Sequence, residues 1–361
     1  MRILIAANDS DGLYFFRRDL IKRFIDDGHE VYVSLPDGDW TENLVEMGCH
    51  FIETPVDRRG INIKNDIKLL IKYFKIIKSV KPDLVITYTI KPNVYCGLAA
   101  RLKRIPYAVN ITGLGTALQG KGVLKEIAKL LYHIGCGKAK VAFTENPGNR
   151  DELCRMKLFK PEKMCVLHGA GVNTEHFAFE EYPPENEKTH FLFIGRIMQE
   201  KGIDEYFAAA DKLLADGYDA DFRIAGTYDE DEYRQQIEQR IKSDRFVYHG
   251  WLTDIRPAIK AAHCFVLPSW HEGMANTLLE SAAMGRPLIT SNIHGCMEAV
   301  NGEENGFLCE VRNADSLYAA MKRFADLPYA EKVEMGRASR DYICKVFEKK
   351  QVVEETVKHL Y

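Results

Sequence analysis

The chain has 361 residues, of which 46% are hydrophobic and 28% are charged. This length suits two α/β domains of similar size, and the composition excludes a chain too polar to bury a core. The net charge of −3 is unevenly divided, with +7 over residues 1–175 and −10 over the rest, so we expect the first half to meet an anionic partner.

An apolar run, residues 1–7, opens the chain. It is too short for a secretory signal or a membrane-spanning helix, and we expect a buried strand. The nine cysteines are scattered, with no Cys-x-x-Cys pair and no histidine cluster at zinc spacing. Reduced, structural cysteines are therefore expected, which favours a cytoplasmic protein, and no metal site is predicted.

Short apolar runs alternate with amphipathic stretches in the first half. Strands are predicted at Ile3–Ala7, His29–Val33, Phe51–Pro55, Leu84–Thr87 and Tyr107–Asn110. Helices are predicted at Tyr14–Asp26, Thr41–Met47, Asn65–Ser79 and Asn93–Leu102. Alternation with short turns predicts a parallel sheet covered by helices on both faces.

The alternation pauses near Gly169–Asn173, and residues 180–189, rich in Glu and Pro, are predicted to form an exposed linker. It then resumes. Strands are predicted at His190–Ile194, Asp221–Ala225, Phe246–His249, Cys264–Pro268 and Pro287–Ser291. Helices are predicted at Ile203–Ala215, Glu232–Ser243, Ile255–Ala262, Thr277–Met284, 315–326 and 330–360. The pattern predicts two doubly wound α/β domains, whose ligands bind beyond the carboxyl ends of the strands, in a cleft between the two sheets.

The clearest chemical signal follows the strand that ends at Pro268. A glycine-containing turn leads into a helix near Asn276, and the free backbone N–H groups of such a helix start suit a phosphate. Glu272 lies in the turn, and Glu280 lies about one turn into the helix. Carboxylates accept hydrogen bonds from the hydroxyls of sugars and riboses. Because the neighbours of Glu280 are apolar, its carboxylate is expected to be buried and to need a partner rather than to be solvated.

A second signal directly follows the strand at 190–194. Arg196 and Lys201 are cations five residues apart in a loop bracketed by Gly195 and Gly202. Taken alone, such cations are usually solvated. At the carboxyl end of a strand, on the same side as Glu272, they are placed to clamp a diphosphate.

Together these residues resemble glycosyltransferase family 4, whose members are retaining enzymes of GT-B architecture. The resemblance covers nearly the whole chain and rests on a combination of motifs. These are the Gly12 turn, Gly28–Val31, Gly169–Asn173, Gly195-Arg196 with Lys201-Gly202, Glu272-x7-Glu280, Gly295 with Glu298, and Asn305–Leu308. Within the family, His271–Gly273 and Asn292–Cys296 are most similar to enzymes that extend lipid-linked glycans for capsule, O-antigen or glycoprotein assembly.

The resemblance implies two Rossmann-like domains, one of residues 1–174 plus about 345–361 that binds the acceptor, and one of residues 175–344 that binds a nucleotide sugar. Arg196 and Lys201 are implied to neutralise the leaving diphosphate, Glu280 to bind the ribose and Glu272 to hold the donor sugar. Catalytic roles are thus implied for Glu272, Arg196 and Lys201. Further donor contacts are implied for Gly12, Gly195, Gly273, Met274, Ala275, Asn276 and Thr277.

The resemblance implies that no cofactor and no metal are needed, because in such enzymes the basic clamp takes the place of a divalent ion; the donor is a substrate, with UDP the default nucleotide. Many relatives carry a histidine after the strand at 107–110, where Thr112 stands here, so no catalytic base is assigned. Lys91, Asn93 and Thr112 are predicted to contact the acceptor, and Lys91 has the alternative of an ordinary surface lysine.

The stretch 64–81 places Ile67, Leu70, Ile71, Phe74 and Ile77 along one helical stripe beside four lysines. It is predicted either as an ordinary surface helix or as a basic face on anionic lipid, where each cation contributes roughly 1 kcal/mol. The second interpretation predicts a peripheral protein on the inner face of the cell membrane with a polyprenyl-diphosphate-linked sugar as acceptor.

Three other functions were weighed. The segment Asn8–Gly12 lacks the Gly-x-Gly-x-x-Gly of nicotinamide-dependent oxidoreductases. A nucleic-acid binder is disfavoured, because basic patches are not interleaved with stacking aromatics and the second half is acidic. A sugar-nucleotide epimerase or hydrolase on the same scaffold stays open.

Overall fold

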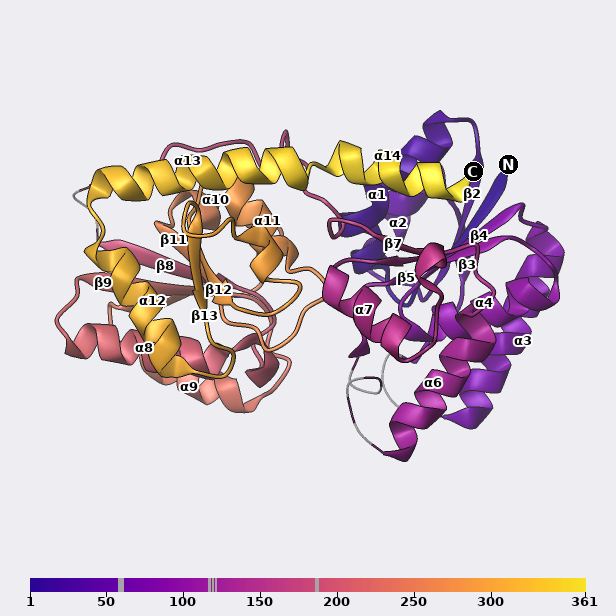
Figure 1. Cartoon of the computed structure of the whole chain (residues 1–361), viewed down its shortest axis with the longest axis horizontal. Helices are drawn as coiled ribbons and strands as arrows, with labels where there is room; N and C mark the ends of the chain where they lie inside the picture. Colours follow the sequence, from indigo (N-terminus) through magenta and orange to yellow (C-terminus); the bar gives the residue numbers. More distant parts are fainter. Residues whose placement is uncertain (58–61, 116–117, 119, 121, 186–187) are drawn as a thin grey trace. The chain divides into compact units, whose positions relative to one another are not determined.

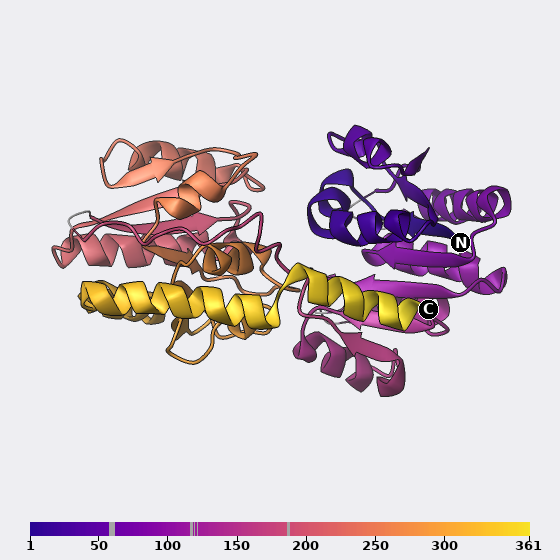
Figure 2. The same cartoon turned by 90° about the horizontal axis from the view of Figure 1, so that it is seen from above.

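The computed structural model describes residues 1–57, 62–115, 118, 120, 122–185 and 188–361. The chain divides into two compact units: unit 1 comprises Met1–Ala170 and Lys350–Tyr361, and unit 2 comprises Gly171–Lys349. Both chain termini lie in unit 1 (Figure 2). Within the described residues, no helix combines the length and apolar character needed to cross a bilayer.

Unit 1 is built on a parallel sheet that, among the described residues, has seven strands in the order β3-β2-β1-β4-β5-β6-β7 (Figure 1). The strands are β1 Arg2–Ala6, β2 Glu30–Leu35, β3 His50–Glu53, β4 Leu84–Tyr88, β5 Tyr107–Ile111, β6 Val141–Thr144 and β7 Met164–Val166. The helices are α1 Ser10–Asp26, α2 Thr41–Glu46, α3 Ile63–Val80, α4 Ile90–Leu102, α6 Val123–Cys136 and α7 Pro147–Arg155, with a 3-10 turn at Pro161–Lys163.

Both faces of this sheet are buried, as the apolar strands require. Ile3 and Ile5 point into one core, and Leu4 and Ala6 point into the other. The last helix, α14 (Lys349–Leu360), adds valines to the Ile3 core, and Lys140 Nζ donates to the carbonyl oxygen of Leu360 over 2.9 Å.

Unit 2 contains a parallel sheet with six strands among the described residues, in the order β10-β9-β8-β11-β12-β13. The strands are β8 Thr189–Ile194, β9 Ala220–Ala225, β10 Phe246–Tyr248, β11 Cys264–Leu267, β12 Leu288–Ser291 and β13 Gly306–Cys309. The helices are α8 Ile203–Ala215, α9 Glu232–Arg240, α10 Arg256–Lys260, α11 Asn276–Ala283, α12 Ala314–Asp326 and α13 Tyr329–Val346, with 3-10 turns at Gln199–Lys201 and Met297–Ala299. The predicted class, two doubly wound parallel-sheet domains, is confirmed.

The predicted linker at 180–189 is not an open segment over the part that the structure describes, which omits residues 186 and 187. Tyr182 donates its hydroxyl proton to the carbonyl oxygen of His263 over 2.9 Å. The fully buried Arg286 guanidinium donates to the carbonyl oxygens of Glu180 and Glu181, both over 2.9 Å. Glu181, Pro184 and Glu185 are exposed as predicted, but the segment is packed against the rest of unit 2, because its backbone carbonyls bind a buried cation.

Candidate functional site

In unit 2 the strand order reverses between β8 and β11, which lie side by side in parallel. Loops that leave two neighbouring strands in opposite directions open a crevice, and ligands of doubly wound sheets bind there. The loop after β8 carries Arg196 and Lys201, and the turn after β11 carries Glu272. The sequence therefore brings its charged candidates to the place where this fold binds ligands.

Backbone contacts lock the two loops together. The amide of Trp270 donates to the carbonyl oxygen of Glu200 over 2.9 Å. Gly202 has φ +77°, and a Cβ there would lie 2.1 Å from the carbonyl oxygen of Pro268. Only glycine combines this conformation with so close an approach, so the loop after β8 rests directly on the end of β11.

Lys201 and Glu272 form an ion pair across this contact, with side chains 18% and 11% exposed. Ser269, which is fully buried, donates its hydroxyl proton to the same carboxylate oxygen, Oε1, over 2.8 Å. A largely desolvated pair holds both groups in fixed positions, because leaving either charge alone is costly. The cation is thus held at the end of β8 and the carboxylate at the end of β11.

Arg196 is more open. Its side chain is 53% exposed, and Nη1 lies 3.1 Å from Oδ2 of Asp229. Gly195 fixes the start of this loop, since its amide donates to the carbonyl oxygen of Ala225 over 3.1 Å. Asp229 engages one nitrogen of this exposed guanidinium, so the group keeps N–H donors for a phosphate.

Helix α11 begins directly after the Glu272 turn and has no side-chain cap and no acidic residue in its first turn. Thr277 Oγ1 donates to the carbonyl oxygen of Ile194 at the end of β8 over 3.3 Å, and the amide of Ala275 donates to the carbonyl oxygen of Gly295 over 2.8 Å. The start of the helix, with its partial positive charge, therefore sits beside the loop that carries Arg196 and Lys201. Of the five predicted backbone donors, Met274 and Ala275 are buried, whereas Gly273, Asn276 and Thr277 are half-buried.

Glu280 lies one turn into α11 and is half-buried. Burial raises the pKa of its carboxyl group to about 7, and the opposing effect of the nearby Lys349 ammonium lowers it only in part. Lys349, which is itself 6% exposed, supplies an opposing charge that acts on this acid through its electrostatic field. A carboxyl group with this pKa is poised to accept hydroxyl hydrogen bonds when ionised.

Sequence reasoning missed several residues of this site. Ser269 stands three positions before Glu272, and its polar side chain at the end of a strand could have been predicted to belong to the site. Asp229 lies 33 residues from Arg196, and only the fold brings them together. Trp270 Nε1 donates to Glu205 Oε1 over 3.0 Å. The guanidinium of Arg312 lies 4.1 Å from the centroid of the Trp270 ring.

In unit 1 the strand order reverses between β1 and β4. Gly12, predicted to approach the donor phosphates, lies in the first turn of α1, and its amide donates to Oδ1 of the capping Asp9 over 2.6 Å. A Cβ at Gly12 would lie 2.7 Å from that oxygen, which gives the glycine a local steric reason. Its contact with a donor stays a prediction.

The predicted acceptor residues lie after β4 and β5. Lys91 Nζ lies 2.9 Å from Asp66 Oδ1, with side chains 15% and 10% exposed, so Lys91 is not an ordinary surface lysine. Asn93 is fully buried: it accepts from the hydroxyl of Thr87 over 2.6 Å and donates to the carbonyl oxygen of Asn110 over 2.8 Å. These contacts tie α4 to the strand ends. Thr112 is half-buried just after β5.

A buried ion pair at this edge of unit 1 was not anticipated. Arg17 Nη2 donates to Glu145 Oε1 over 2.6 Å, with both side chains 10% exposed, and the guanidinium lies 5.0 Å from the ring centroid of Tyr88. It joins α1, the end of β4 and the segment after β6. Neither residue belongs to a recognisable sequence pattern.

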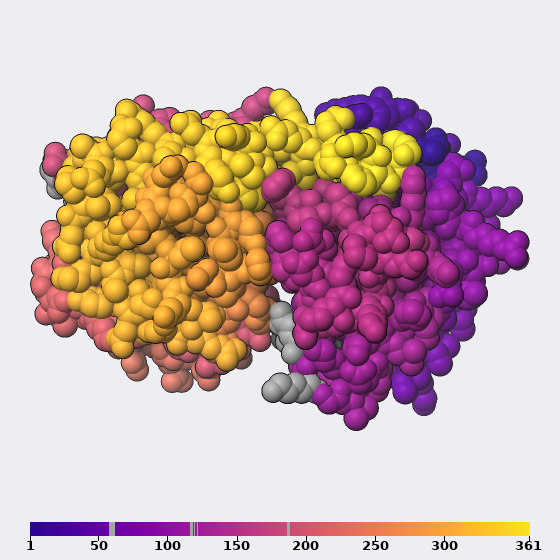
Figure 3. All heavy atoms as spheres, viewed as in Figure 1, coloured from indigo at the N-terminus to yellow at the C-terminus, as the bar shows by residue number. Residues whose placement is uncertain are grey.

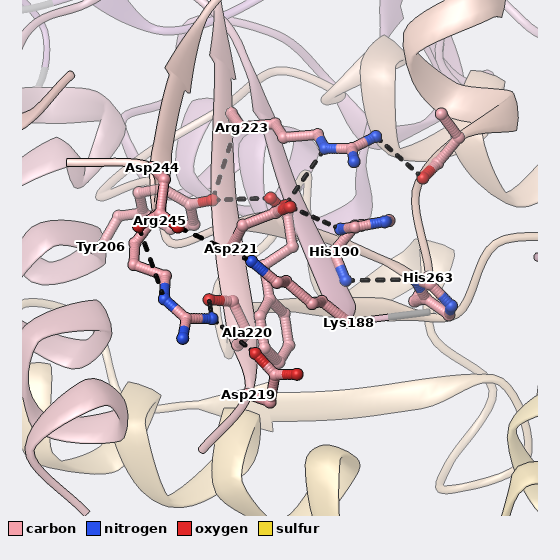
Figure 4. Close-up of polar contacts among 12 residues, drawn as sticks. Lys188, His190, Tyr206, Asp219, Ala220, Asp221, Arg223, Asp244, Arg245 and His263 are labelled. Carbon is pink, nitrogen blue, oxygen red and sulfur yellow. Dashed lines mark hydrogen bonds and ion pairs between the residues drawn. The ribbon is translucent and has the colours of Figure 1, made fainter. Parts of the chain in front are cut away.

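Two polar groups lie away from the strand reversals. Cys165 in the middle of β7, with Glu355 and His359 of α14, is the one trio of possible metal ligands within the described residues. At the amino-terminal edge of the unit 2 sheet, Asp221 Oδ2 lies 2.8 Å from Nδ1 of His190, and the amide of His190 donates to Nδ1 of His263 over 3.0 Å (Figure 4). Both groups join strands to neighbouring segments, and the predicted absence of a metal at the donor site stays a prediction.

Comparison with known proteins bears on the fold and the family. A family model for glycosyl transferases group 1 matches residues 188–326, and a glycosyl transferase 4-like model matches residues 2–146. Among solved structures, the HepE protein of Anabaena in complex with UDP and glucose superimposes with a TM-score of 0.82, covering 100% of this chain and 99% of that one at 16% identity. A glycosyltransferase of Rickettsia africae gives a TM-score of 0.80 at 19% identity, covering 99% and 97%.

Two relatives are similar over most of their length. The chain is 32% identical to the UDP-Gal:alpha-D-GlcNAc-diphosphoundecaprenol alpha-1,3-galactosyltransferase of Escherichia coli, over 74% of this chain and 73% of that protein. It is 28% identical to the N,N'-diacetylbacillosaminyl-diphospho-undecaprenol alpha-1,3-N-acetylgalactosaminyltransferase of Campylobacter jejuni, over 88% and 87%. The chain therefore belongs to the glycosyltransferases of family 4, with GT-B architecture, and its activity is sugar transfer.

Proposed function

We propose that the protein transfers a sugar from a nucleotide sugar, a UDP-hexose or UDP-N-acetylhexosamine, to a lipid-linked glycan in the biosynthesis of a bacterial surface polysaccharide or glycoconjugate. The observation that carries this proposal is the Lys201–Glu272 pair, held at the β8/β11 reversal beside the uncapped start of α11. One cation, one carboxylate and a row of backbone amides meet there. A sugar diphosphate offers the matching groups.

In this proposal the diphosphate binds between the start of α11 and the loop after β8. Lys201 supplies a fixed positive charge, and the exposed Arg196 turns from Asp229 to the phosphate oxygens. Negative charge grows on the diphosphate as the glycosidic bond breaks, so cations fixed beside it lower the barrier. This arrangement needs no divalent metal, and the nucleoside diphosphate departs as the leaving group.

The two acids hold the hydroxyls on either side of the diphosphate. Glu272, oriented by Ser269 and Lys201, accepts hydrogen bonds from the donor sugar near its reacting carbon. Glu280, one turn into α11, accepts from the ribose hydroxyls. Ionised carboxylates make the stronger hydrogen bonds, so donor binding is expected to favour the ionised form of Glu280.

The names of the two similar transferases support a polyprenyl-diphosphate-linked sugar as the acceptor. Lys91, with Thr112, stands near the carboxyl edge of unit 1 and is assigned to the acceptor phosphate. The family resemblance supports retention of the anomeric configuration as part of this proposal. No residue is assigned as a catalytic base.

The test is a transfer assay with radiolabelled UDP-, GDP- and ADP-sugars and a short polyprenyl-diphosphate-N-acetylhexosamine acceptor. We expect a disaccharide-lipid product from a UDP-sugar, an undiminished rate in excess EDTA, and an axial anomeric linkage by NMR when the donor is α-linked. Sugar release or isomerisation at the same rate without acceptor would instead identify a hydrolase or epimerase. Dependence on an added divalent ion would refute the metal-free clamp.

A further inference from the structure

Helix α6 of unit 1 turns an apolar stripe toward solvent. Val123 is 76% exposed and Leu130 58% exposed. The stripe also includes exposed Leu124, Ile127 and Ile134. Val123, Ile127, Leu130 and Ile134 follow the spacing of one helix face. A soluble protein rarely leaves such a face without a partner.

The orientation of α6 is fixed by its other face. Tyr132 is 1% exposed, and Tyr107 donates its hydroxyl proton to the carbonyl oxygen of Gly135 over 2.9 Å. A Cβ at Gly135 would lie 2.4 Å from the carbonyl oxygen of Val94, so α6 and α4 touch backbone to backbone. Rotating the helix to bury its apolar stripe would break these contacts.

Helix α3 presents a second apolar stripe. Ile63, Ile67 and Ile71 are 70%, 53% and 49% exposed at successive helical turns. The face that packs inward is instead formed by Leu69, Tyr73, Ile76, Ile77 and Val80. Of the predicted stripe, Ile67 and Ile71 are exposed, whereas Leu70 and Phe74 are half-buried and Ile77 is buried.

The outer part of α3 is strongly basic. Five lysines of this helix are exposed: Lys64, Lys68, Lys72, Lys75 and Lys78. Within the described part of the chain, no ion pair is formed by any of them. The only acid of α3, Asp66, is buried against Lys91 and does not offset this charge. The lysines of α6 contribute less, since Lys129 is paired with Glu126.

Helices α3 and α6, which carry the two stripes, belong to one helical layer of unit 1. Helix α4 packs against both α3 and α6, and Figure 1 shows the three helices together on the same side of the sheet. The space-filling view shows α6 on the surface of unit 1 (Figure 3). Because α3 follows β3 and α6 follows β5, both helices begin at the carboxyl edge of the sheet, where ligands bind.

We propose that the outer faces of α3 and α6 form a docking surface for an anionic phospholipid bilayer, with the α6 stripe entering the acyl boundary and the α3 lysines lying on the headgroups. Apolar side chains next to unpaired lysines match an interface that is apolar inside and anionic at its surface. A second copy of the chain fits less well, because it would bring five uncompensated lysines against five others.

The proposal rests on the proposed lipid-linked acceptor and adds how that acceptor is reached. A polyprenyl diphosphate stays anchored in the bilayer with its charged group at the surface. Docking through α3 and α6 brings the carboxyl edge of the unit 1 sheet, with Lys91, to that surface. Rates on membrane-embedded acceptor then depend on this surface, whereas rates on a water-soluble acceptor do not.

The test is flotation of the full chain with vesicles of phosphatidylglycerol and phosphatidylcholine. We expect the full chain to bind these vesicles and the binding to weaken as the salt concentration rises. The double variant Lys68→Glu/Lys72→Glu should bind at least ~30-fold more weakly, because each lost cation contributes roughly 1 kcal/mol. Ile127→Ser/Leu130→Ser should bind at least ~10-fold more weakly at any salt concentration. The matched control, Ile241→Ser/Lys242→Glu, changes an exposed isoleucine and lysine of unit 2 and should bind as wild type.

Each variant is also assayed with a water-soluble short-chain acceptor and for UDP binding. Retained transfer there, with lost transfer on vesicle-embedded acceptor, supports the docking surface and shows that the variants fold. Binding of both surface variants equal to wild type would overturn it, as would sedimentation showing that the stripe instead holds two copies together. Absence of transfer from every acceptor, with vesicle binding intact, would refute the proposed function and leave the surface standing.

Discussion

At the scale of single residues, the proposed donor site depends on the ion pair between Lys201 and Glu272. Lys201, Glu272 and Ser269 hold one another in fixed positions. Groups fixed before the reaction spend little energy on reorganisation when charge develops. We therefore assign Glu272 to the sugar-transfer step more than to nucleotide affinity.

Replacing Glu272 tests this assignment. Glu272→Gln keeps the shape but removes the charge, and turnover should fall ~100-fold or more while the Kd for UDP changes less than ~5-fold. Isothermal titration with UDP and initial-rate kinetics give the two values. Glu303→Gln, which removes one half of an exposed pair with Arg323, is the control and should change neither. A larger loss of UDP affinity than of turnover would contradict the role.

Glu280 makes a prediction about pH. Its folded pKa of about 7 exceeds the ordinary value of 4.5, so the folded state binds the proton more tightly than the unfolded state. The contribution of this proton to the free energy of unfolding is complete below pH 4.5. It is lost as the pH rises through 7, which lowers the free energy of unfolding by about 2–3 kcal/mol. Glu280→Gln should thus be more stable than wild type at pH 8 and show no such gain at pH 4.5, as urea unfolding would reveal.

The same substitution should weaken UDP binding, because the ribose loses its carboxylate partner. A stabilised Glu280→Gln protein with unchanged UDP affinity would refute the ribose role while leaving the pKa argument intact. A variant less stable than wild type at pH 8 would refute the pKa argument.

At the scale of elements, strands and helices with clear periodicity could be predicted from the sequence. Helix α8 was predicted with the bounds that the structure gives, Ile203–Ala215, and most other predicted elements differ by one to four residues at their ends. No element was predicted between residues 112 and 168, which hold α6, β6, α7 and β7. Helix α6 shows a related difficulty: its apolar stripe faces solvent, and an amphipathic pattern in a sequence does not tell which face of a helix is buried.

The donor loops were predictable for a physical reason, whereas their partners were not. Arg196, Lys201 and Glu272 each follow a strand closely, and a parallel sheet places such residues at one edge. Asp229 and Lys349 come from distant segments, and their positions depend on how the chain folds. In the same way, the sequence did not predict that Asn93 would have its amide group bonded within the sheet.

The contact between the loops predicts the effect of one small change. Gly202→Ala introduces a Cβ 2.1 Å from the carbonyl oxygen of Pro268 at φ +77°, so both backbones must shift. We expect a loss of about 1–3 kcal/mol of stability and at least ~10-fold weaker UDP binding. Gly217→Ala, at φ +85° with no atom within 4 Å, is the control for backbone strain alone. Equal UDP affinities in the two variants would show that the contact does not shape the site.

At the scale of the whole molecule, stability should fall in acid because of His263. Its Nδ1 accepts the amide proton of His190, and burial lowers its pKa to about 4, with His190, Lys332 and Arg223 adding repulsion and a hydrogen bond to Pro184 opposing it. His263 binds a proton near pH 6.5 in the unfolded chain and only near pH 4 in the folded chain. The free energy of unfolding therefore decreases as the pH falls below 6.5, by about 2 kcal/mol at pH 5.

His263→Asn, which keeps an acceptor for the His190 amide and does not titrate, serves as the comparison. Urea unfolding at pH 7 and pH 5 should show a smaller acid loss in this variant than in wild type by about 2 kcal/mol. Parallel losses in the two proteins would mean that other groups govern acid unfolding.

The most direct test of the donor site is a crystal structure of the protein with an intact UDP-sugar. We expect the diphosphate at the start of α11 between β8 and β11, with Lys201 and Arg196 within hydrogen-bonding distance of its oxygens, Glu272 on the sugar and Glu280 on the ribose. A diphosphate bound elsewhere, with both cations turned toward solvent or toward their present acidic partners, would contradict the proposed chemistry.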